Sequence, residues 1–500
     1  MDFSYVTPQF VLLVFLGSVA GLFVGSIPGL SVSMATALLV SITYTWGTND
    51  ALAMIMGVYV VGVFSGAVSA ILINIPGAPS SVVTTLDGYP MAKKGEAYKA
   101  LFYATLYSFV GSVIGLAALW LLAKPVSDLA LSFRAQDYFL LSLFGLVTVS
   151  SVTSKNYAKG IAAAALGVLL SLVGLDPVDG TPRLTLGLTE LNNGIATVPA
   201  LVGLFGFAEV LSVVFDGPAS QTVLAMKQQR VSLRKALRHL PLSLYTSAIG
   251  TLIGALPGAG GPVAAFLAYN ETRRIVKKPE VPFGEGAVEG IVASESSNNA
   301  CIGGALIPML TLGVPGDAVT AIIMSVFMIH GLQPGPTFLT KCADSFGAIL
   351  VAGFIACVAV LLLGLLVAPK LSRVISVPRN VLLPVVTVLC VVGAFACNNR
   401  LFDVVLMFLF GLLGFAMRRR GYPAAPLVLG LVLGSGMDSK LRKALGLALA
   451  RKAPLAYLFS RPITIILTAL TVLVVLGSIP AVKRLATRLK AALLPKKAQH

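Results

Sequence analysis

Long apolar runs dominate this chain of 500 residues. Residues 101–123, 348–367 and 463–479 are each long enough to cross a bilayer, which takes about 20 residues of helix. Hydrophobic residues make up 57% of the chain and charged residues only 11%, whereas a soluble domain carries about 25% charged residues. The sequence therefore predicts an all-α polytopic membrane protein, and its first apolar run is too extended for a cleaved signal peptide.

Four of the apolar runs are interrupted by a proline followed by a glycine. The breaks lie at Pro28-Gly29, Pro76-Gly77, Pro257-Gly258 and Pro315-Gly316. They form two ordered pairs, with offsets of 229 residues (257 − 28) and 239 residues (315 − 76). Proline removes an amide donor and glycine adds backbone freedom, so each break exposes polar backbone that only protein or a water-filled cavity can satisfy inside a membrane. Such paired breaks are typical of the binding site of a secondary transporter.

The basic residues indicate the topology of the chain. We expect about 12 transmembrane segments, some broken or re-entrant, with the lysine- and arginine-rich loops in the cytoplasm. An odd number of crossings in the first half predicts two inverted-topology repeats, residues 1–216 and 239–437. A basic cytoplasmic linker, 217–238, joins them, and 438–500 form an extension with the last transmembrane helix and a basic tail.

The net charge of +17 comes from basic residues that cluster between the apolar runs. This distribution is typical of cytoplasmic loops, and without a basic face interleaved with aromatic residues we expect no nucleic-acid binding. One stretch conflicts with the positive-inside rule. If residues 424–437 cross the membrane, the basic residues in 440–452 lie outside, and if they do not cross, the basic tail lies outside instead. We favour the crossing because it preserves the repeat.

Each break restarts a helix, whose free amides and positive dipole end attract an anion. Small residues and hydroxyl groups beside the breaks let a carboxylate approach the backbone. We therefore predict a substrate site that contains Pro28, Gly29, Ser31, Pro76, Gly77, Ser80, Ser81, Pro257, Gly258, Gly260, Ser296, Pro315 and Gly316. The alternative interpretation is that the pairs only kink membrane helices, but four breaks in two ordered pairs favour a site.

The most polar part of a predicted membrane segment is residues 285–299, EGAVEGIVASESSNN. Polar groups inside a membrane are costly and functional by default. Glu295, Asn298, Asn299 and Asp317 are candidate ligands of a coupling ion, either sodium or a proton. Two alternatives stay open, which are an interfacial loop for 285–299 and a helix N-cap for Asp317.

The sequence gives little indication of metal binding or enzymatic activity. The three histidines and five cysteines have no metal-binding spacing, and neither HExxH nor a phosphate-binding loop occurs. We expect no enzymatic activity and no cofactor beyond a coupling ion. Because the sequence has no phosphate-binding loop, we expect the energy for transport to come from an ion gradient or from another subunit. Glu209, in the middle of an apolar run, either pairs with a basic residue or takes part in proton coupling.

Several of these motifs occur together in one known family. They are GSIPGL at 25–30, NIPGAP at 74–79, DGYPMAKKG at 87–95, GLDPV at 174–178, LPGAG at 256–260, GEGAVEGIVASESSNNA at 284–300, GVPGD at 313–317 and GLQPGP at 331–336. With these motifs the chain resembles the large membrane subunit of tripartite tricarboxylate transporters, although its C-terminal third matches only in general character.

The resemblance implies a multi-pass subunit of the bacterial inner membrane. Its partners would be a small membrane subunit and a periplasmic solute-binding protein, and its substrates organic acids such as citrate. Uptake would be driven by a sodium or proton gradient. A passive anion channel, or a scaffold subunit for a partner, is the alternative function.

Overall fold

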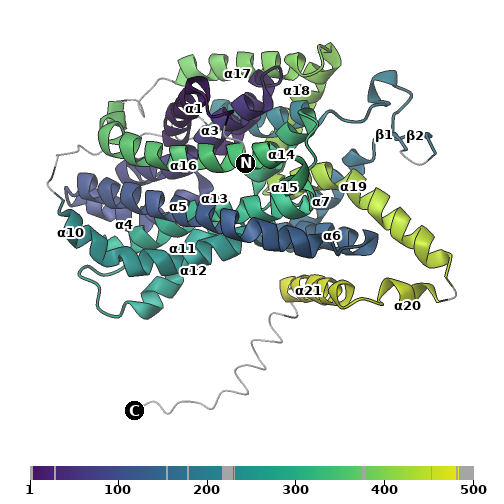
Figure 1. Ribbon diagram of the computed structural model, residues 1–500. Coiled ribbons are helices and arrows are strands. Elements are labelled where there is room, and N and C mark those ends of the chain that lie inside the picture. Colours follow the sequence, from purple (N-terminus) through teal and green to yellow (C-terminus); the bar gives the residue numbers. More distant parts are fainter. Residues whose placement is uncertain are drawn as a thin grey trace.

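The computed structural model describes residues 4–27, 30–153, 156–176, 179–216, 229, 231–373, 379–451, 453–479 and 482. Regular structure in this part of the chain is almost entirely helical, apart from one short β-hairpin (Figure 1). Six helices are long and apolar enough to cross a membrane, and five further apolar helices of 10–17 residues are shorter. The predicted all-α polytopic fold is confirmed.

The first half contains two of the predicted breaks. Its helices are α1 (Pro8–Ser26), α2 (Val32–Ile42), α3 (Thr48–Ile73), α4 (Val82–Lys93), α5 (Ala97–Ala130), α6 (Ala135–Val152), α7 (Tyr157–Ser171), α8 (Thr197–Leu201) and α9 (Ala208–Asp216). The shorter elements are η1 (Pro79–Ser81), β1 (Gly174–Leu175), β2 (Pro182–Arg183), η2 (Thr189–Leu191) and the π-helical segment η3 (Val202–Phe207). The first break falls between α1 and α2, and the second between α3 and η1.

The second half contains the other two breaks. Its elements are α10 (Leu233–Ala236), η4 (Leu237–His239), α11 (Leu240–Gly254), α12 (Gly260–Ile275), α13 (Val288–Leu312), α14 (Ala318–Ile329), α15 (Phe338–Lys341), α16 (Ala343–Leu366), η5 (Ala368–Arg373), α17 (Arg379–Ala396), α18 (Leu401–Arg419), α19 (Ala424–Leu449), α20 (Pro454–Leu458) and α21 (Pro462–Ser478). The breaks separate α11 from α12 and α13 from α14. Most of the predicted linker, 217–228 and 230, and the basic tail from Lys483 lie outside the described residues.

Two helices form the centre of the molecule. Residues 51–73 of α3 are almost all buried, as are residues 290–311 of α13. Residues 288–299 of the polar stretch that the sequence singled out belong to α13, so all of it but 285–287 is helix, and the interfacial-loop alternative is wrong. α5 packs against α13 and α16 packs against α3, which places a helix of each half against the central helix of the other (Figure 1).

The two halves repeat the same close helix packing. A Cβ atom on Gly21 of α1 would collide with the carbonyl of Val58 on α3, and one on Gly250 of α11 would collide with the carbonyl of Ser297 on α13. These contacts are offset by 229 residues (250 − 21) and 239 residues (297 − 58), as the breaks are. The correspondence between the halves therefore extends from the motifs to the helix packing.

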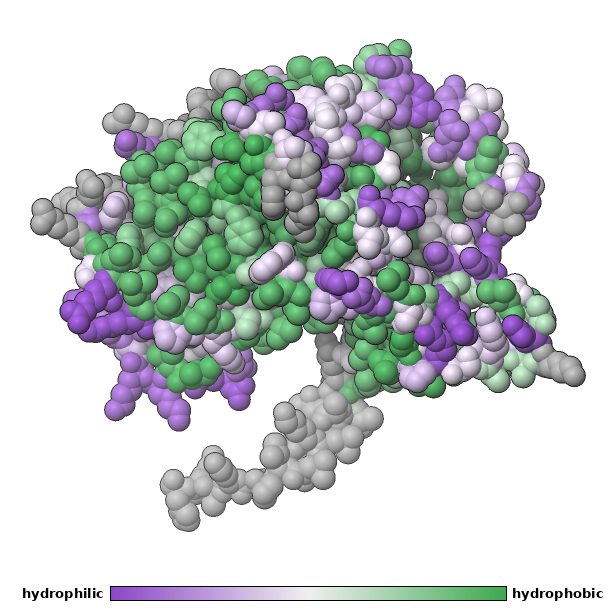
Figure 2. Space-filling view, in the orientation of Figure 1, coloured by the Kyte–Doolittle hydropathy of each residue, from purple (hydrophilic) through white to green (hydrophobic). Residues whose placement is uncertain are grey.

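The outer surface is largely apolar. Figure 2 shows a broad hydrophobic face over α5 and α16, with hydrophilic residues gathered toward the edges of the molecule. Large exposed side chains on this surface include Trp120, Leu121, Phe354, Val358 and Leu362. A broad exposed apolar face is rare on soluble monomers, so this surface suits a lipid environment.

The C-terminal end of α19 lies beside the β-hairpin. Arg183 of β2 forms ion pairs with Asp176 and with Asp438 of α19, the latter at 3.0 Å, and Arg442 lies 3.1 Å from both aspartates. Residues 424–437 continue directly into the basic stretch, as one helix of 26 residues. These ion pairs place the end of α19 and the hairpin on the same face of the molecule.

Candidate functional site

The tips of all four broken segments meet at one cavity of about 710 Å³. Its wall contains Ser31 at the start of α2, residues 76–80 between α3 and α4, residues 258–263 around the start of α12, and residues 317–319 at the start of α14. α19 contributes Ala424, Ala425 and Leu429. A single space is therefore shared by segments that lie up to about 400 residues apart in the sequence.

The second and fourth breaks have the same backbone conformation. α3 ends at Ile73 and Asn74 is left-handed, with φ 58°, while α13 ends at Leu312 and Gly313 is left-handed, with φ 69°. A left-handed residue commonly terminates a helix, and the proline two positions later cannot continue it. The residues of each break therefore terminate the helix that precedes it.

Glycine is required at these breaks because the backbones touch. A Cβ atom on Gly77 would collide with the carbonyl of Gly25 at the end of α1, and one on Gly316 would collide with Gly254 at the end of α11. Gly258, with φ 75°, donates its N–H to the Gly316 carbonyl at 2.7 Å. In the second half, the two breaks are therefore joined directly by backbone contacts.

Four α-helices begin at the cavity, namely α2, α12, α14 and α19, and they differ in their capping. Ser31 caps α2 by accepting the Met34 N–H at 3.1 Å, and Asp317 caps α14 by accepting the Thr320 N–H at 2.8 Å. The N-cap of α12, Ala259, supplies no side-chain acceptor. α19, whose N-cap is Pro423, also lacks a side-chain cap. The first amides of α12 and of α19 are therefore left without one.

Asn298 of α13 faces the cavity close to the uncapped start of α12. The residue is only 2% exposed, and its Nδ2 atom has no hydrogen-bond partner among the described residues. A Cβ atom on Gly261 would collide with Asn298 Oδ1 and lie 3.1 Å from Cβ of Ser80. Glycine at position 261 therefore brings the start of α12, the Asn298 amide and the Ser80 side chain together.

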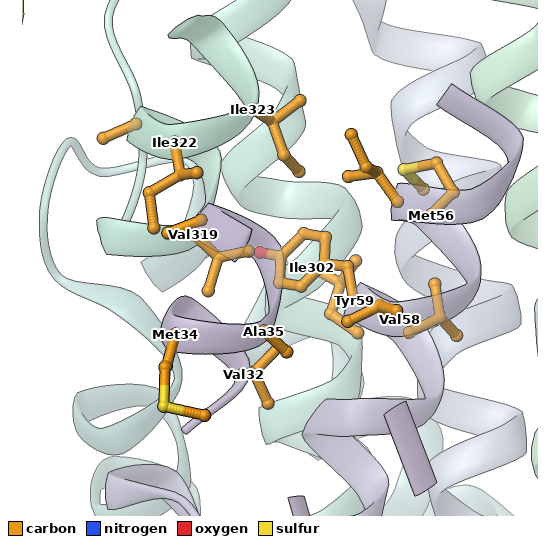
Figure 3. Close-up of a cluster of buried hydrophobic side chains, with 14 of the residues drawn as sticks. Val32, Met34, Ala35, Met56, Val58, Tyr59, Ile302, Val319, Ile322 and Ile323 are labelled. Carbon is orange, nitrogen blue, oxygen red and sulfur yellow. The ribbon is translucent and has the colours of Figure 1, made fainter. Parts of the chain in front are cut away.

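Asp317 is an N-cap, as one of the sequence-based alternatives proposed, and it also contacts the first half. The Tyr59 hydroxyl of α3 donates to Asp317 Oδ2 at 2.8 Å. Figure 3 shows the Tyr59 ring among Val32, Ile302 and Val319, which belong to α2, α13 and α14. This partly buried hydrogen bond ties the fourth break to the central helix of the other half.

The predicted site residues divide between the cavity and its surroundings. Those that line the cavity are Ser31, Pro76, Gly77, Ser80, Gly258, Gly260, Asn298 and Asp317. Those that pack behind it are Ser81, Pro257, Glu295, Ser296, Asn299, Pro315 and Gly316. Pro28 and Gly29 lie outside the described residues.

Glu295 lies on a different face of α13, in a buried network of hydroxyl and amide groups. Its carboxylate accepts hydrogen bonds from Thr84 of α4 and, at 2.9 Å, from Ser108 of α5. The Asn299 amide donates to Ser108 Oγ at 2.9 Å. All four residues of this network are buried. Glu295 is the one ionisable residue among them. Ser296, one residue further, bonds instead to Thr246 of α11 at 2.6 Å.

A second cavity of about 580 Å³ adjoins the first and shares part of its wall. The shared residues include Glu209 of α9 and Arg418 of α18, which form an ion pair. Of the two roles predicted for Glu209, the structure shows the pairing with a basic residue.

Two residues of the site were missed by the sequence analysis. Tyr59 sits in a continuous apolar run, and Arg418 in a terminal cluster of three arginines, so neither stands out by its neighbours. The correspondence of the halves contained a signal for Tyr59, because an offset of 239 residues pairs it with Asn298 (298 − 59).

The sequence was compared with known proteins. The model of the tripartite tricarboxylate transporter TctA family matches residues 11–429. A protein of Agrobacterium vitis described as "Uncharacterized 52.8 kDa protein in TAR-I ttuC' 3'region" is 33% identical over 441 residues, which is 88% of each chain. A second, "Uncharacterized protein in TAR-II ttuC' 3'region" of the same organism, is 35% identical over 196 residues, 39% of this chain and 81% of its own length. No solved structure matches. The chain belongs to the tripartite tricarboxylate transporter TctA family.

Proposed function

We propose that this chain is the transmembrane subunit of a binding-protein-dependent secondary transporter, which takes up tricarboxylates or related organic acids by ion-coupled symport. Its family makes it a membrane component of a transporter. The observation that carries the rest is the meeting of all four broken segments at one cavity. Substrate sites of secondary transporters are formed in this way by discontinuous helices of two repeats.

The cavity offers hydrogen-bond donors to a carboxylate. The uncapped amides at the start of α12, the unpartnered Nδ2 of Asn298 and the hydroxyl of Ser80 lie together on its wall. A carboxylate accepts hydrogen bonds only, and a helix N-terminus adds a favourable dipole. We assign the substrate carboxylate to this corner of the cavity rather than to the capped ends of α2 and α14.

The buried network around Glu295 is proposed as the site of the coupling ion. A bare carboxylate inside a membrane is costly, and the groups that contact Glu295 are neutral. A sodium ion or a proton would neutralise it. Asn298 and Asn299 are neighbours on α13, one facing the substrate cavity and one the network, so a shift of α13 would affect both sites.

Alternating access would use the two halves as inverted repeats, residues 1–216 and 239–437. The equivalent glycine contacts of α1 with α3 and of α11 with α13 support this proposal. The tripartite family name implies partner subunits. In this proposal they are a small membrane subunit and a periplasmic binding protein, which would complete the complex in the bacterial inner membrane.

The proposal is tested by uptake into proteoliposomes that contain the complete complex. Labelled citrate and a panel of di- and tricarboxylates are supplied, with sodium and proton gradients imposed separately. Asn298→Ala and Gly77→Leu are compared with Gly446→Ala, whose added methyl group meets nothing within 4 Å. We expect concentrative uptake that follows one gradient, is lost in the first two variants and persists in the third. Uptake that only equilibrates and ignores both substitutions would point to a channel instead.

A further inference from the structure

The ion pair of Arg418 and Glu209 stands where the two cavities meet. Both residues line the cavity at the four breaks and also the adjoining one, whose wall further contains Asn156, Lys159 and Tyr422. The pair therefore borders the passage between the two cavities. The positive-inside prediction assigns the second cavity to the cytoplasmic side, because Lys159 and residues 418–420 are basic.

The local fold presents both charges to this passage. Arg418 is in the last turn of α18, and Glu209 follows the π-helical segment η3. A Cβ atom on Gly414 would lie 2.9 Å from Cβ of Ala208, so a glycine allows α18 to approach the start of α9 closely. π-Helical turns interrupt the regular register of a helix and occur frequently at functional sites.

Arg418 keeps donors available while it is paired. Its Nη1 donates to Glu209, and no other acceptor for this guanidinium occurs within the described ranges. The side chain is 56% exposed and lines both cavities, so its Nε and Nη2 edge is not enclosed by packed protein. That edge matches a carboxylate, which arginine binds with two parallel hydrogen bonds.

The other charged groups of the two walls are engaged elsewhere. Among the described lining residues, the remaining ones are Asp317 and Lys159. Asp317 is held by Tyr59 and Thr320, and Lys159 donates to the Arg420 carbonyl and lies 5.1 Å from the centre of the Tyr422 ring. Arg418 is therefore the cation best placed to receive an anionic solute from the first cavity.

We propose that Arg418 is a second carboxylate-binding residue, which makes the transporter selective for acids with two or more carboxylates. This inference rests on the proposed uptake of organic acids. One carboxylate binds at the start of α12 beside Asn298, and another binds the free edge of Arg418, while Glu209 orients the guanidinium. An acid with a single carboxylate satisfies only one of these sites.

The test measures uptake kinetics of labelled citrate and succinate by the complete complex, with unlabelled lactate as a competitor. Arg418→Gln should raise KM for citrate and succinate about tenfold or more, because a charge-assisted pair of hydrogen bonds is lost, and leave the weak inhibition by lactate unchanged. Arg418→Lys keeps the charge without the planar fork, so its KM should lie between the KM of the unsubstituted protein and that of Arg418→Gln. Glu209→Gln should raise KM less than Arg418→Gln.

Arg419→Gln is the matched control, since Arg419 is the next residue but lines neither cavity and lies over the Phe415 ring. If Arg418→Gln is poorly folded by size-exclusion chromatography, Arg418→Lys carries the test. An unchanged KM in Arg418→Lys and Arg418→Gln, or an equal rise in Arg419→Gln, would overturn the role of Arg418 and leave the proposed uptake intact. If the unsubstituted complex takes up neither acid, the proposed function itself fails.

Discussion

At the scale of single residues, the buried carboxylate of Asp87 joins the halves at one end of the fold. It accepts hydrogen bonds from the Tyr269 hydroxyl at 2.9 Å and from the backbone N–H groups of Gly284, Gly286 and Ala287 at 2.8–3.0 Å. We predict that Asp87→Asn lowers the free energy of unfolding by about 1–3 kcal/mol, because a neutral amide oxygen is a weaker acceptor than a carboxylate oxygen for the three N–H groups that share Oδ1. Thermal unfolding in detergent measures the change.

Two further variants calibrate that effect. Tyr269→Phe removes one of the four donors and should cost about 1 kcal/mol. Asp128→Asn removes an exposed carboxylate that pairs with Lys124 and should leave the unfolding temperature nearly unchanged. If Asp87→Asn unfolds no earlier than Asp128→Asn, the carboxylate does not hold the loop before α13.

Single residues of the site were predictable where a polar side chain lies within an apolar run. Asn298, Glu295 and Asp317 stood out because polar atoms in apolar runs are costly, and the structure places all three at or behind the cavity. Their separation into a cavity face and a network face was not predictable, since neighbouring residues of a helix point in different directions only once its packing partners are known. Asp87 was visible as part of a motif, but its contact with residues 284–287 joins segments about 200 residues apart.

At the scale of elements, the breaks depend on close contact between backbones. We predict that Gly77→Ala and Gly316→Ala each reduce folded yield and unfolding temperature, because a Cβ atom would collide with the ends of α1 and α11. The cost should be about 1–3 kcal/mol, typical of overpacking. Fluorescence-detected size-exclusion chromatography with a temperature ramp measures both quantities.

Gly446→Ala is the control within a helix, since its added methyl group meets nothing within 4 Å. It should leave stability unchanged or raise it by about 0.5–1 kcal/mol through the better helix propensity of alanine. Equal behaviour of Gly77→Ala and Gly446→Ala would mean that the break tolerates a wider spacing than the structure has.

The positions of the breaks were predictable because proline and glycine act locally: α3 and α13 both end three residues before their proline. Helix ends without such markers were not. α19 continues to Leu449, twelve residues beyond the predicted end of its crossing at Met437, because ion pairs with Asp176 and Arg183 support its polar half. Those partners precede it by more than 250 residues, so no local pattern indicated them.

At the scale of the whole molecule, the inverted repeats remain a prediction about direction. The equivalent packing of α1 on α3 and of α11 on α13 shows that the halves resemble each other, yet packing alone does not say which end of each half faces the cytoplasm. The charge pattern does. Lys93 and Lys94 follow the second break, whereas the segment after the fourth break carries a single lysine, Lys341. Equivalent loops should therefore lie on opposite sides of the membrane.

Labelling of single cysteines with a membrane-impermeant maleimide tests this arrangement in oriented vesicles. The background replaces all five cysteines, of which Cys342 is only partly buried and Cys301, Cys357, Cys390 and Cys397 are buried. We expect Lys93→Cys to react only from the cytoplasmic side, and Gln333→Cys, in the segment after the fourth break, only from the outside. Arg274→Cys, in the basic last turn of α12, is the cytoplasmic reference.

Lys443→Cys addresses the conflict at the end of α19. The ion pairs of Arg442 with Asp176 and of Arg183 with Asp438 fix this end on the face of the β-hairpin, where two positive and two negative charges balance. That balance weakens the drive to retain the stretch in the cytoplasm, so we expect labelling from the outside, together with Thr189→Cys at the start of η2, six residues after the hairpin. Labelling of residues 93 and 333 from the same side would exclude inverted repeats. Labelling of residues 189 and 443 from opposite sides would instead mean that the ion pairs do not form in the membrane.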